Sequence, residues 1–239
     1  MSPALANPHP EAAAVSAPLP LCRSLLNLLN LYTRAKVGSM ALGGRSLHGI
    51  GEWHGVIQHD GGPFLTLPSA ILEKLEEFSW ALTLSAVVRE PFAMPLVWVT
   101  FDLAPTFADG PRGWAHYPDE TRLAAARGAV ERFGVAPSVI IDGYSVLAVG
   151  WTLTEPLTDE IRARDLLRRL AEKLGAPLPE ASDPLSATIS LPGSIVRNVG
   201  TVDVPVVQVV TLDQDRTVSG ADLEAALRPP PARKKGVTA

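Results

Sequence analysis

The sequence has few of the features that assign a protein to a class at once. It has one cysteine, Cys22, which excludes an intrachain disulfide and a zinc site built from cysteines. Its net charge is −4 over 239 residues, so any surface that binds nucleic acid must be local. No apolar run reaches the roughly 18 residues that a membrane span needs, and no basic segment precedes an apolar one at the N-terminus. We therefore expect a cytoplasmic protein without a membrane segment.

Hydrophobic residues make up 46% of the chain, enough for a sizeable core. Residues 1–20, rich in Ala and Pro, and a basic tail at 228–239 are expected to be disordered. Between them we expect an N-terminal region at 21–66 and an α+β domain at 67–227, because helical and strand patterns alternate there without a regular β-α-β series.

The N-terminal region has two distinct patterns. Five leucines fall within residues 22–32, which predicts a short helix that docks on the body of the protein or on a protein partner. Residues 38–62 are rich in glycine and include His48, His54 and His59. Histidines at this spacing could bind a metal, but no second group of ligands accompanies them. A solvated glycine-rich loop is the favoured interpretation.

The α+β domain is expected to begin with a helix capped by Ser69. Strands are predicted at 80–88 and 96–103, and a helix that stops at Gly134 follows them. A further helix is predicted from a cap at Thr158 to Gly175. The remaining predicted elements are a strand–turn–strand hairpin within 137–157, a core strand within 204–213 and a short capped helix at 219–227.

Three local sequences, taken in order, give the chain a family resemblance. They are "WVTFDLAP" (98–105), "PSVIIDGYSVLAVGWTLTEPL" (137–157) and "SLPGSIVRN" (190–198). In this order residues 80–227 resemble the archaeo-eukaryotic primase–polymerase superfamily, in its small plasmid and phage replication branch. The resemblance implies a primase-like, RRM-like central antiparallel sheet flanked by helices, here with an N-terminal extension.

The first of these sequences lies where the family has an Asp-x-Asp pair. Two acids at i and i+2 of a strand point to one face, and transfer of a nucleotide by two metal ions needs several such carboxylates. Asp102 matches the first acid, but Ala104 stands at the second position. Asp102 is thus either a vestigial catalytic metal ligand or an ordinary strand-end residue that caps the turn before Pro105.

The hairpin lies where the family has Ser-Gly-x-Gly-x-His, whose glycines let the backbone approach nucleotide phosphates. The resemblance makes Gly143 and Ser145 candidate nucleotide-binding residues. Asp142 would bring a negative charge to an anion site, and Leu147 would replace the histidine, although the following tryptophan, Trp151, lies one place late. The alternative is a tight Asp-Gly hairpin turn with no ligand.

The third sequence lies where the family has a Leu-Pro-Gly-Thr-x-Asn-x-Lys turn. It keeps a glycine and a hydroxyl at Gly193 and Ser194, and Arg197 stands near its basic end. Backbone N–H groups and an arginine suit a phosphate, so these three residues are candidates for binding an anion.

Basic residues of the helix predicted at 158–175 are the best local positive feature. They could contact phosphates, or they could be a solvated helix face, because acids interleave with them. The basic tail could add a weak contact. These candidate nucleic-acid-binding residues are Arg162, Arg168, Arg169, Lys173, Arg233, Lys234 and Lys235.

These patterns predict a degenerate primase-like protein that binds DNA or RNA, or a replication or defence partner, without catalysis. Two alternatives stay open. One is an active primase or polymerase with relocated metal ligands, and the other is an interaction subunit anchored by residues 22–32. No cofactor is expected, and Mg²⁺ or Mn²⁺ is expected only if the protein is active.

Overall fold

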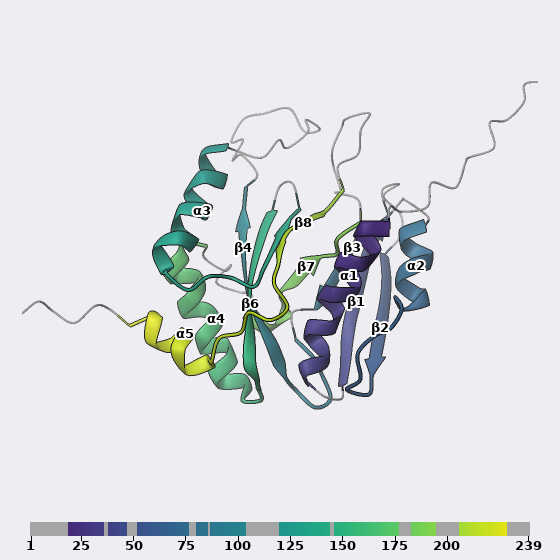
Figure 1. Ribbon diagram of the computed structural model, residues 1–239, viewed down its shortest axis with the longest axis horizontal. Coiled ribbons are helices and arrows are strands. Elements are labelled where there is room, and N and C mark those ends of the chain that lie inside the picture. The colour runs from purple at the N-terminus through teal and green to yellow at the C-terminus, as the bar shows by residue number, and fades with distance from the viewer. Residues whose placement is uncertain are drawn as a thin grey trace, which may run out of the picture.

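The strands form two separate antiparallel sheets of four strands each, flanked by helices (Figure 1). The computed structural model describes residues 19–35, 38–46, 52–76, 80–85, 87–103, 120–143, 146–176, 183–194 and 206–228. The predicted α+β class, with antiparallel strands and flanking helices, is confirmed. The strands are divided between two sheets instead of lying in one central sheet.

The first sheet has the order β2 (Glu52–His59), β1 (Gly38–Ser46), β3 (Trp80–Ser85) and β7 (Thr188–Ser190). The second has the order β4 (Met94–Asp102), β6 (Val146–Leu157), β5 (Val139–Asp142) and β8 (Gln208–Leu212). The first sheet therefore joins strands from both sides of the domain boundary that was expected between residues 66 and 67.

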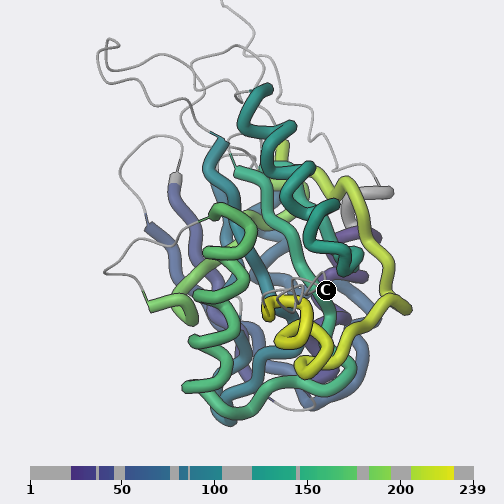
Figure 2. The backbone as a smooth tube through the Cα atoms, turned by 90° about the vertical axis from the view of Figure 1, so that its left-hand side faces the viewer, coloured from purple at the N-terminus to yellow at the C-terminus, as the bar shows by residue number. Residues whose placement is uncertain are grey.

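The helices lie on two sides of the second sheet. On one side are α3 (Glu120–Phe133), α4 (Glu160–Leu174) and α5 (Gly220–Ala226), which lie nearest the viewer in Figure 2. On the other are α1 (Leu19–Tyr32) and α2 (Ser69–Glu76), together with the first sheet (Figure 1). Two short 3₁₀ helices, Thr33–Ala35 and Pro184–Ser186, complete the described elements. Of the helices in the described ranges, none has the length and apolar character that a membrane crossing requires.

The alternation of side chains along β4 and β6 builds two cores. Odd-numbered residues such as Val97, Val149 and Trp151 pack with the leucines of α4. Even-numbered residues such as Trp98 and Ala148 pack with α1 and the first sheet. Successive residues of a strand point to opposite faces. The exception is Met94, which packs in the same core as the odd-numbered residues because the register of β4 shifts between Met94 and Leu96.

The leucine-rich helix α1 docks on the body of the protein. Leu25, Leu28 and Leu29 are fully buried, and Leu31 is 2% exposed, so these side chains are not available to anchor a partner. The side-chain amide of Asn30 exchanges two hydrogen bonds with the backbone of Phe64, at 2.7 and 3.2 Å. Of the two interpretations of residues 22–32, docking on the body is the one that the structure shows.

The glycine-rich stretch at 38–62, expected to be a loop, instead supplies strands β1 and β2. Its glycines fit a sheet here because other side chains fill the space beside them. A Cβ on Gly55 would lie only 2.6 Å from the nearest ring atom of Trp53, so the Trp53 ring occupies the space of the missing side chain. Of the three histidines, His54 is exposed on β2, His59 is 6% exposed, and His48 lies outside the described residues.

One face of the first sheet is not covered by a helix of the described chain. Along β2 the even-numbered residues Glu52, His54, Val56 and Gln58 are all exposed, while Ile57 and His59 are buried. The buried set faces α1 and α2 through the first core cluster. The opposite face is therefore open to solvent.

Local signals predict the ends of α3 and α4, whereas the cap of α4 and the place of the last strand differ from the prediction. Gly134 and Gly175 end α3 and α4 with positive φ angles, as predicted. The cap of α4 is Asp159 and not Thr158, because the Asp159 carboxylate accepts from the N–H groups of Ile161 and Arg162. The last strand, expected in the core, is the edge strand β8, whose Val210 is 53% exposed.

A candidate site between the two sheets

A small cavity of about 220 Å³ lies where the two sheets approach each other. The first sheet contributes side chains from β3 and β7, and the second contributes side chains from β4, β5 and β6. Its lining is Thr83, Thr100, Ile141, Gly143, Val146, Ala148, Thr188, Ile189 and Ser190.

Strand pairing brings these residues together. Thr83 pairs with Ser190 across β3 and β7, and Thr188 lies two residues from Ser190 on the same face. On the second sheet Ala148 pairs with both Thr100 and Ile141. Gly143 lies where the second sheet approaches β7, since a methyl group on it would lie 3.7 Å from the Ser190 Oγ.

Four hydroxyl groups face this cavity, and the described part of the chain does not bond to them. Within the described chain, the side chains of Thr83, Thr100, Thr188 and Ser190 make no hydrogen bond. By contrast, the buried Ser138 and Thr152 hydroxyls lie 2.8 Å apart and bond to each other. The four hydroxyls of the cavity are half-buried or exposed and therefore within reach of water, so a ligand that displaces this water can bond to them.

Asp102 lies at the end of β4 on the cavity's face of the sheet. It is exposed and two residues from Thr100, so the two side chains point the same way. The predicted metal ligand therefore lies on the face of the second sheet that the cavity occupies. Ala104, at the position of the second acid, is outside the described residues.

We call the cavity together with Asp102 at its edge the cleft. The described residues of the cleft do not fit a pair of divalent metal ions. Such ions need several oxygen ligands, most of them carboxylates. The cavity lining itself has no carboxylate, and Asp102 beside it supplies only one. Among the described residues no group of three or more His, Cys, Asp or Glu side chains could hold a metal.

The structure corrects the interpretation of the hairpin. Leu147 is 2% exposed and packs in the core beside α4, on the far face of the sheet from the cavity. Asp142 pairs with Leu147 and points to that same far face, so it brings no charge into the cavity. Val146 and Ala148 line the cavity instead. Gly143 lies at the cavity, and its role in binding a nucleotide stays a prediction, whereas Ser145 is outside the described residues.

The predicted anion site after β7 has its donors already engaged. The N–H of Gly193 donates to the Val207 carbonyl at 2.9 Å, and the N–H of Ser194 donates to the Leu191 carbonyl at 3.1 Å. The Ser194 hydroxyl also donates to Leu191, at 2.7 Å. These bonds favour a structural turn over anion binding. The role assigned to Arg197, outside the described residues, stays a prediction.

Two of the four basic residues predicted on α4, Arg162 and Arg169, are in ion pairs. Arg162 Nε lies 2.7 Å from Glu224 Oε1, and this hydrogen bond raises the pKa of Arg162. Arg169 pairs with Asp165 at 3.2 Å. Arg168 and Lys173 have no ion pair within the described chain and are exposed. Arg233, Lys234 and Lys235 are outside the described residues.

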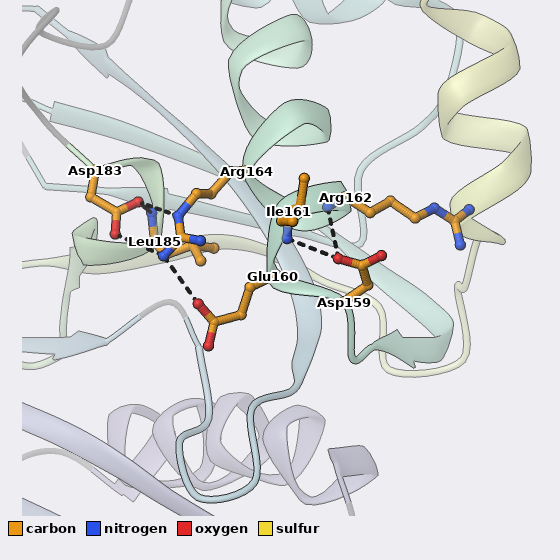
Figure 3. Close-up of polar contacts among 7 residues, drawn as sticks. All are labelled: Asp159, Glu160, Ile161, Arg162, Arg164, Asp183 and Leu185. Atoms are coloured by element: carbon orange, nitrogen blue, oxygen red, sulfur yellow. Dashed lines mark hydrogen bonds and ion pairs between the residues drawn. The ribbon is translucent and has the colours of Figure 1, made fainter.

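Figure 3 shows the start of α4, where Arg164 bridges two acids. Its guanidinium lies 3.0 Å from Glu160 Oε2 and 3.1 Å from Asp183 Oδ1. The hydrogen bond from Arg164 lowers the pKa of Asp183. Because the buried side of α4 packs on the odd-numbered face of β4 and β6, this helix lies on the opposite face of the second sheet from the cavity. Phosphate binding by α4 stays a prediction.

Sequence reasoning missed the four hydroxyl residues of the cavity. The sequence does contain two pairs of polar residues spaced two apart. Thr100 and Asp102 lie on the strand predicted at 96–103, and Thr188 and Ser190 lie on β7. Polar residues at i and i+2 of a strand share one face. Nothing local, however, shows that two such pairs from different sheets meet.

No family model matches this sequence, and no curated protein matches it. Solved structures do match the fold. The primase domain of the primase-polymerase of cyanophage S-2L has a TM-score of 0.54 at 16% identity, and the match covers 86% of this chain and 98% of that one.

Two structures of primase RepB' also match. The first has a TM-score of 0.54 at 13% identity, covering 85% of this chain and 62% of that one. The second, its catalytic domain in complex with initiator DNA, has a TM-score of 0.52 at 13% identity, covering 85% and 93%. With identities this low the likeness concerns the fold, and this chain therefore has the fold of archaeo-eukaryotic primase–polymerase domains.

Proposed function

We propose that this protein binds single-stranded nucleic acid in the cleft between its two sheets and does not transfer nucleotides there. The observation that carries the proposal is a continuous row of small and polar residues. The row crosses the open face of the first sheet and ends at the cavity.

The row takes one residue from each strand of the first sheet. His54 pairs with Gly43, Gly43 pairs with Thr83, and Thr83 pairs with Ser190. Adjacent strands lie about 4.8 Å apart, so the row is about 14 Å long. A Cβ on Gly43 would lie 2.8 Å from Thr83 Oγ1, so glycine here keeps the surface flat.

A flat row of this kind suits an extended nucleotide chain. Single strands bind to sheet surfaces on which bases stack on side-chain rings and polar groups contact the backbone. His54, whose side chain is 80% exposed, offers such a ring at the outer end of the row. Arg45 lies on the same face, 3.3 Å from the carboxylate of Glu52, so this ion pair adds little net positive charge to the row. We therefore expect modest affinity that falls as salt rises.

The fold supports nucleic acid as the ligand class. The catalytic domain of primase RepB', which shares this fold, was solved with initiator DNA. Among the described residues, the cavity lining has no carboxylate and Asp102 at its edge is one acid where a two-metal reaction needs several, which supports binding without catalysis.

The test is binding of fluorescein-labelled single-stranded DNA and RNA, followed by anisotropy at increasing salt. Thr188→Glu places a carboxylate on the exposed edge of the cleft and should weaken binding severalfold by repelling phosphates. Thr154→Glu is the matched control, since Thr154 is also an exposed strand threonine but lies near the other end of β6. Equal effects of the two variants, or no binding at low salt, would reject the proposal.

An active enzyme is the second candidate, and the position of Asp102 on the cleft face favours it. Primer synthesis in the presence of Mn²⁺ distinguishes the two. Synthesis by the natural protein that is abolished in Asp102→Asn would show catalysis and overturn the non-catalytic part of the proposal. Binding without synthesis is the expected result.

A further inference from the structure

We infer that the cavity between the sheets receives one unpaired nucleobase, and not the phosphates of a nucleotide. This inference rests on the proposed function and assigns the ligand group of the cleft. Its evidence is the size of the cavity, the absence of charge on its lining and the arrangement of its hydroxyl groups.

The size of the cavity limits what it can hold. Its volume is about 220 Å³, whereas pockets for drug-sized ligands have about 300 to 1,000 Å³. A nucleoside triphosphate is a ligand of the larger class. A single flat base, with its sugar and phosphate left outside, is matched to the smaller volume.

The cavity offers little to a phosphate. Phosphates are held by Arg, Lys and free backbone N–H groups. No lining residue among those described carries a positive charge. The N–H of Gly143 is already used, since it donates to the Val146 carbonyl at 2.8 Å. Asp102, on the same face of β4, adds a negative charge at the edge.

The lining does match the two surfaces of a base. Ile141, Ala148 and Ile189 give an apolar contact for the faces of the ring. The hydroxyls of Thr83, Thr100, Thr188 and Ser190 can each donate and accept a hydrogen bond, as the edge of a base requires. Because a hydroxyl can reverse its role, such a cavity should accept all bases with little preference.

The position of the cavity explains how a base would reach it. Ser190 is both the last residue of the row across the first sheet and part of the cavity lining. A single-stranded nucleic acid that lies along the row would therefore have the base that follows Ser190 beside the opening of the cavity. Rotating that base out of the stack costs little when the nucleic acid is already single-stranded.

The test compares two probes on the full chain: oligothymidylate, and an abasic oligomer of the same length with the same phosphates. Thr100→Val and Ser190→Ala remove hydroxyls from opposite walls of the cavity, and Thr154→Val is the control. Each cavity variant should raise the Kd for oligothymidylate about two- to tenfold, the range expected for one hydrogen bond. The Kd for the abasic oligomer should not change.

The outcomes separate the inference from the proposed function. If the cavity variants weaken both probes equally, the hydroxyls contact the sugar–phosphate backbone, and the base-binding inference is overturned while nucleic-acid binding stands. If neither probe binds the natural protein, the proposed function fails and the inference falls with it. Thermal melting of each variant shows that a lost affinity does not reflect unfolding.

Discussion

The indole Nε1 of Trp98 donates a hydrogen bond to the hydroxyl of Tyr32, at 3.1 Å, inside the core. Tyr32 is fully buried at the end of α1, and Trp98 is 4% exposed on β4. This bond joins the N-terminal helix to the second sheet, two residues before Thr100 of the cavity. The N-terminal helix is thus part of the support for the cleft.

Tyr32→Phe should destabilise the protein by about 1 to 3 kcal/mol, because it leaves the buried Trp98 N–H without a partner. Urea unfolding followed by circular dichroism measures this loss. Trp98→Phe provides the control. In that background the donor is already absent, so the additional cost of Tyr32→Phe should fall well below its cost in the natural protein. Equal costs in the two backgrounds would show that the bond contributes nothing.

Alkaline pH should destabilise the protein through the same residue. Burial raises the pKa of Tyr32 well above its usual range, while its hydrogen bond with Trp98 opposes this shift. In the unfolded chain the phenol ionises near pH 10. Above that pH the unfolded state loses a proton that the folded state keeps, so the free energy of unfolding should fall as pH rises.

The size of this alkaline effect is set by one proton, at most about 1.4 kcal/mol per pH unit. Urea unfolding measures this pH dependence from about pH 8 to about pH 11, a range that spans the usual pKa of tyrosine. Tyr32→Phe, which has no phenol there, should show a shallower dependence. Identical slopes in the natural protein and the variant would contradict the assignment.

Features set by neighbouring residues could be predicted from the sequence. Gly134 and Gly175 end their helices because they adopt positive φ angles that other residues resist. The hairpin of β5 and β6 follows from apolar runs on both sides of Asp142 and Gly143. In both cases the deciding interactions lie within a few residues.

Features set by distant pairing could not be predicted. The glycines of β1 resemble a loop until β2 and β3 pair on both sides of Gly43. Which residues of the β5–β6 hairpin face the other sheet depends on such pairing, because successive residues of a strand point to opposite faces. Leu147 packs in the core beside α4, whereas its neighbour Ala148 lines the cavity.

Gly143→Ala should reduce binding, and the backbone at Val146 should shift by a few tenths of an ångström to admit the methyl group. Gly143 does not have the positive φ seen at Gly193, where φ is +87°. The added methyl group would enter the cavity beside Ser190 and press on the Val146 carbonyl oxygen at 3.1 Å. We expect the Kd for oligothymidylate to rise about tenfold, which is about 1.4 kcal/mol of binding free energy.

Gly193→Ala is the matched control for that variant. A methyl group there has room, since its nearest neighbour in the described chain would be Leu75 Cδ2 at 3.8 Å, but the positive φ disfavours any side chain. It should lower stability by about 1 kcal/mol or more and leave the Kd of the folded protein unchanged. A larger loss of binding in Gly193→Ala than in Gly143→Ala would place the ligand at the turn after β7.

Reversing the charges of α4 tests which face of the molecule meets nucleic acid. Arg168→Glu with Arg169→Glu changes the net charge by four units on the face opposite the cavity. If binding occurs in the cleft, the Kd should change less than about threefold at moderate salt, because exposed charges beyond about 10 Å are largely screened. Titrations at several salt concentrations measure both the Kd and its salt dependence.

The neutral double variant, Arg168→Gln with Arg169→Gln, is the control for lost helix contacts, since Arg169 pairs with Asp165 in the natural protein. If both variants bind as the natural protein does, α4 serves the fold alone. If the Glu variant loses affinity, the Gln variant loses about half as much free energy, and the salt dependence falls with them, then phosphates lie on α4. That outcome would restore the prediction made from the sequence and remove the cleft as the principal binding surface.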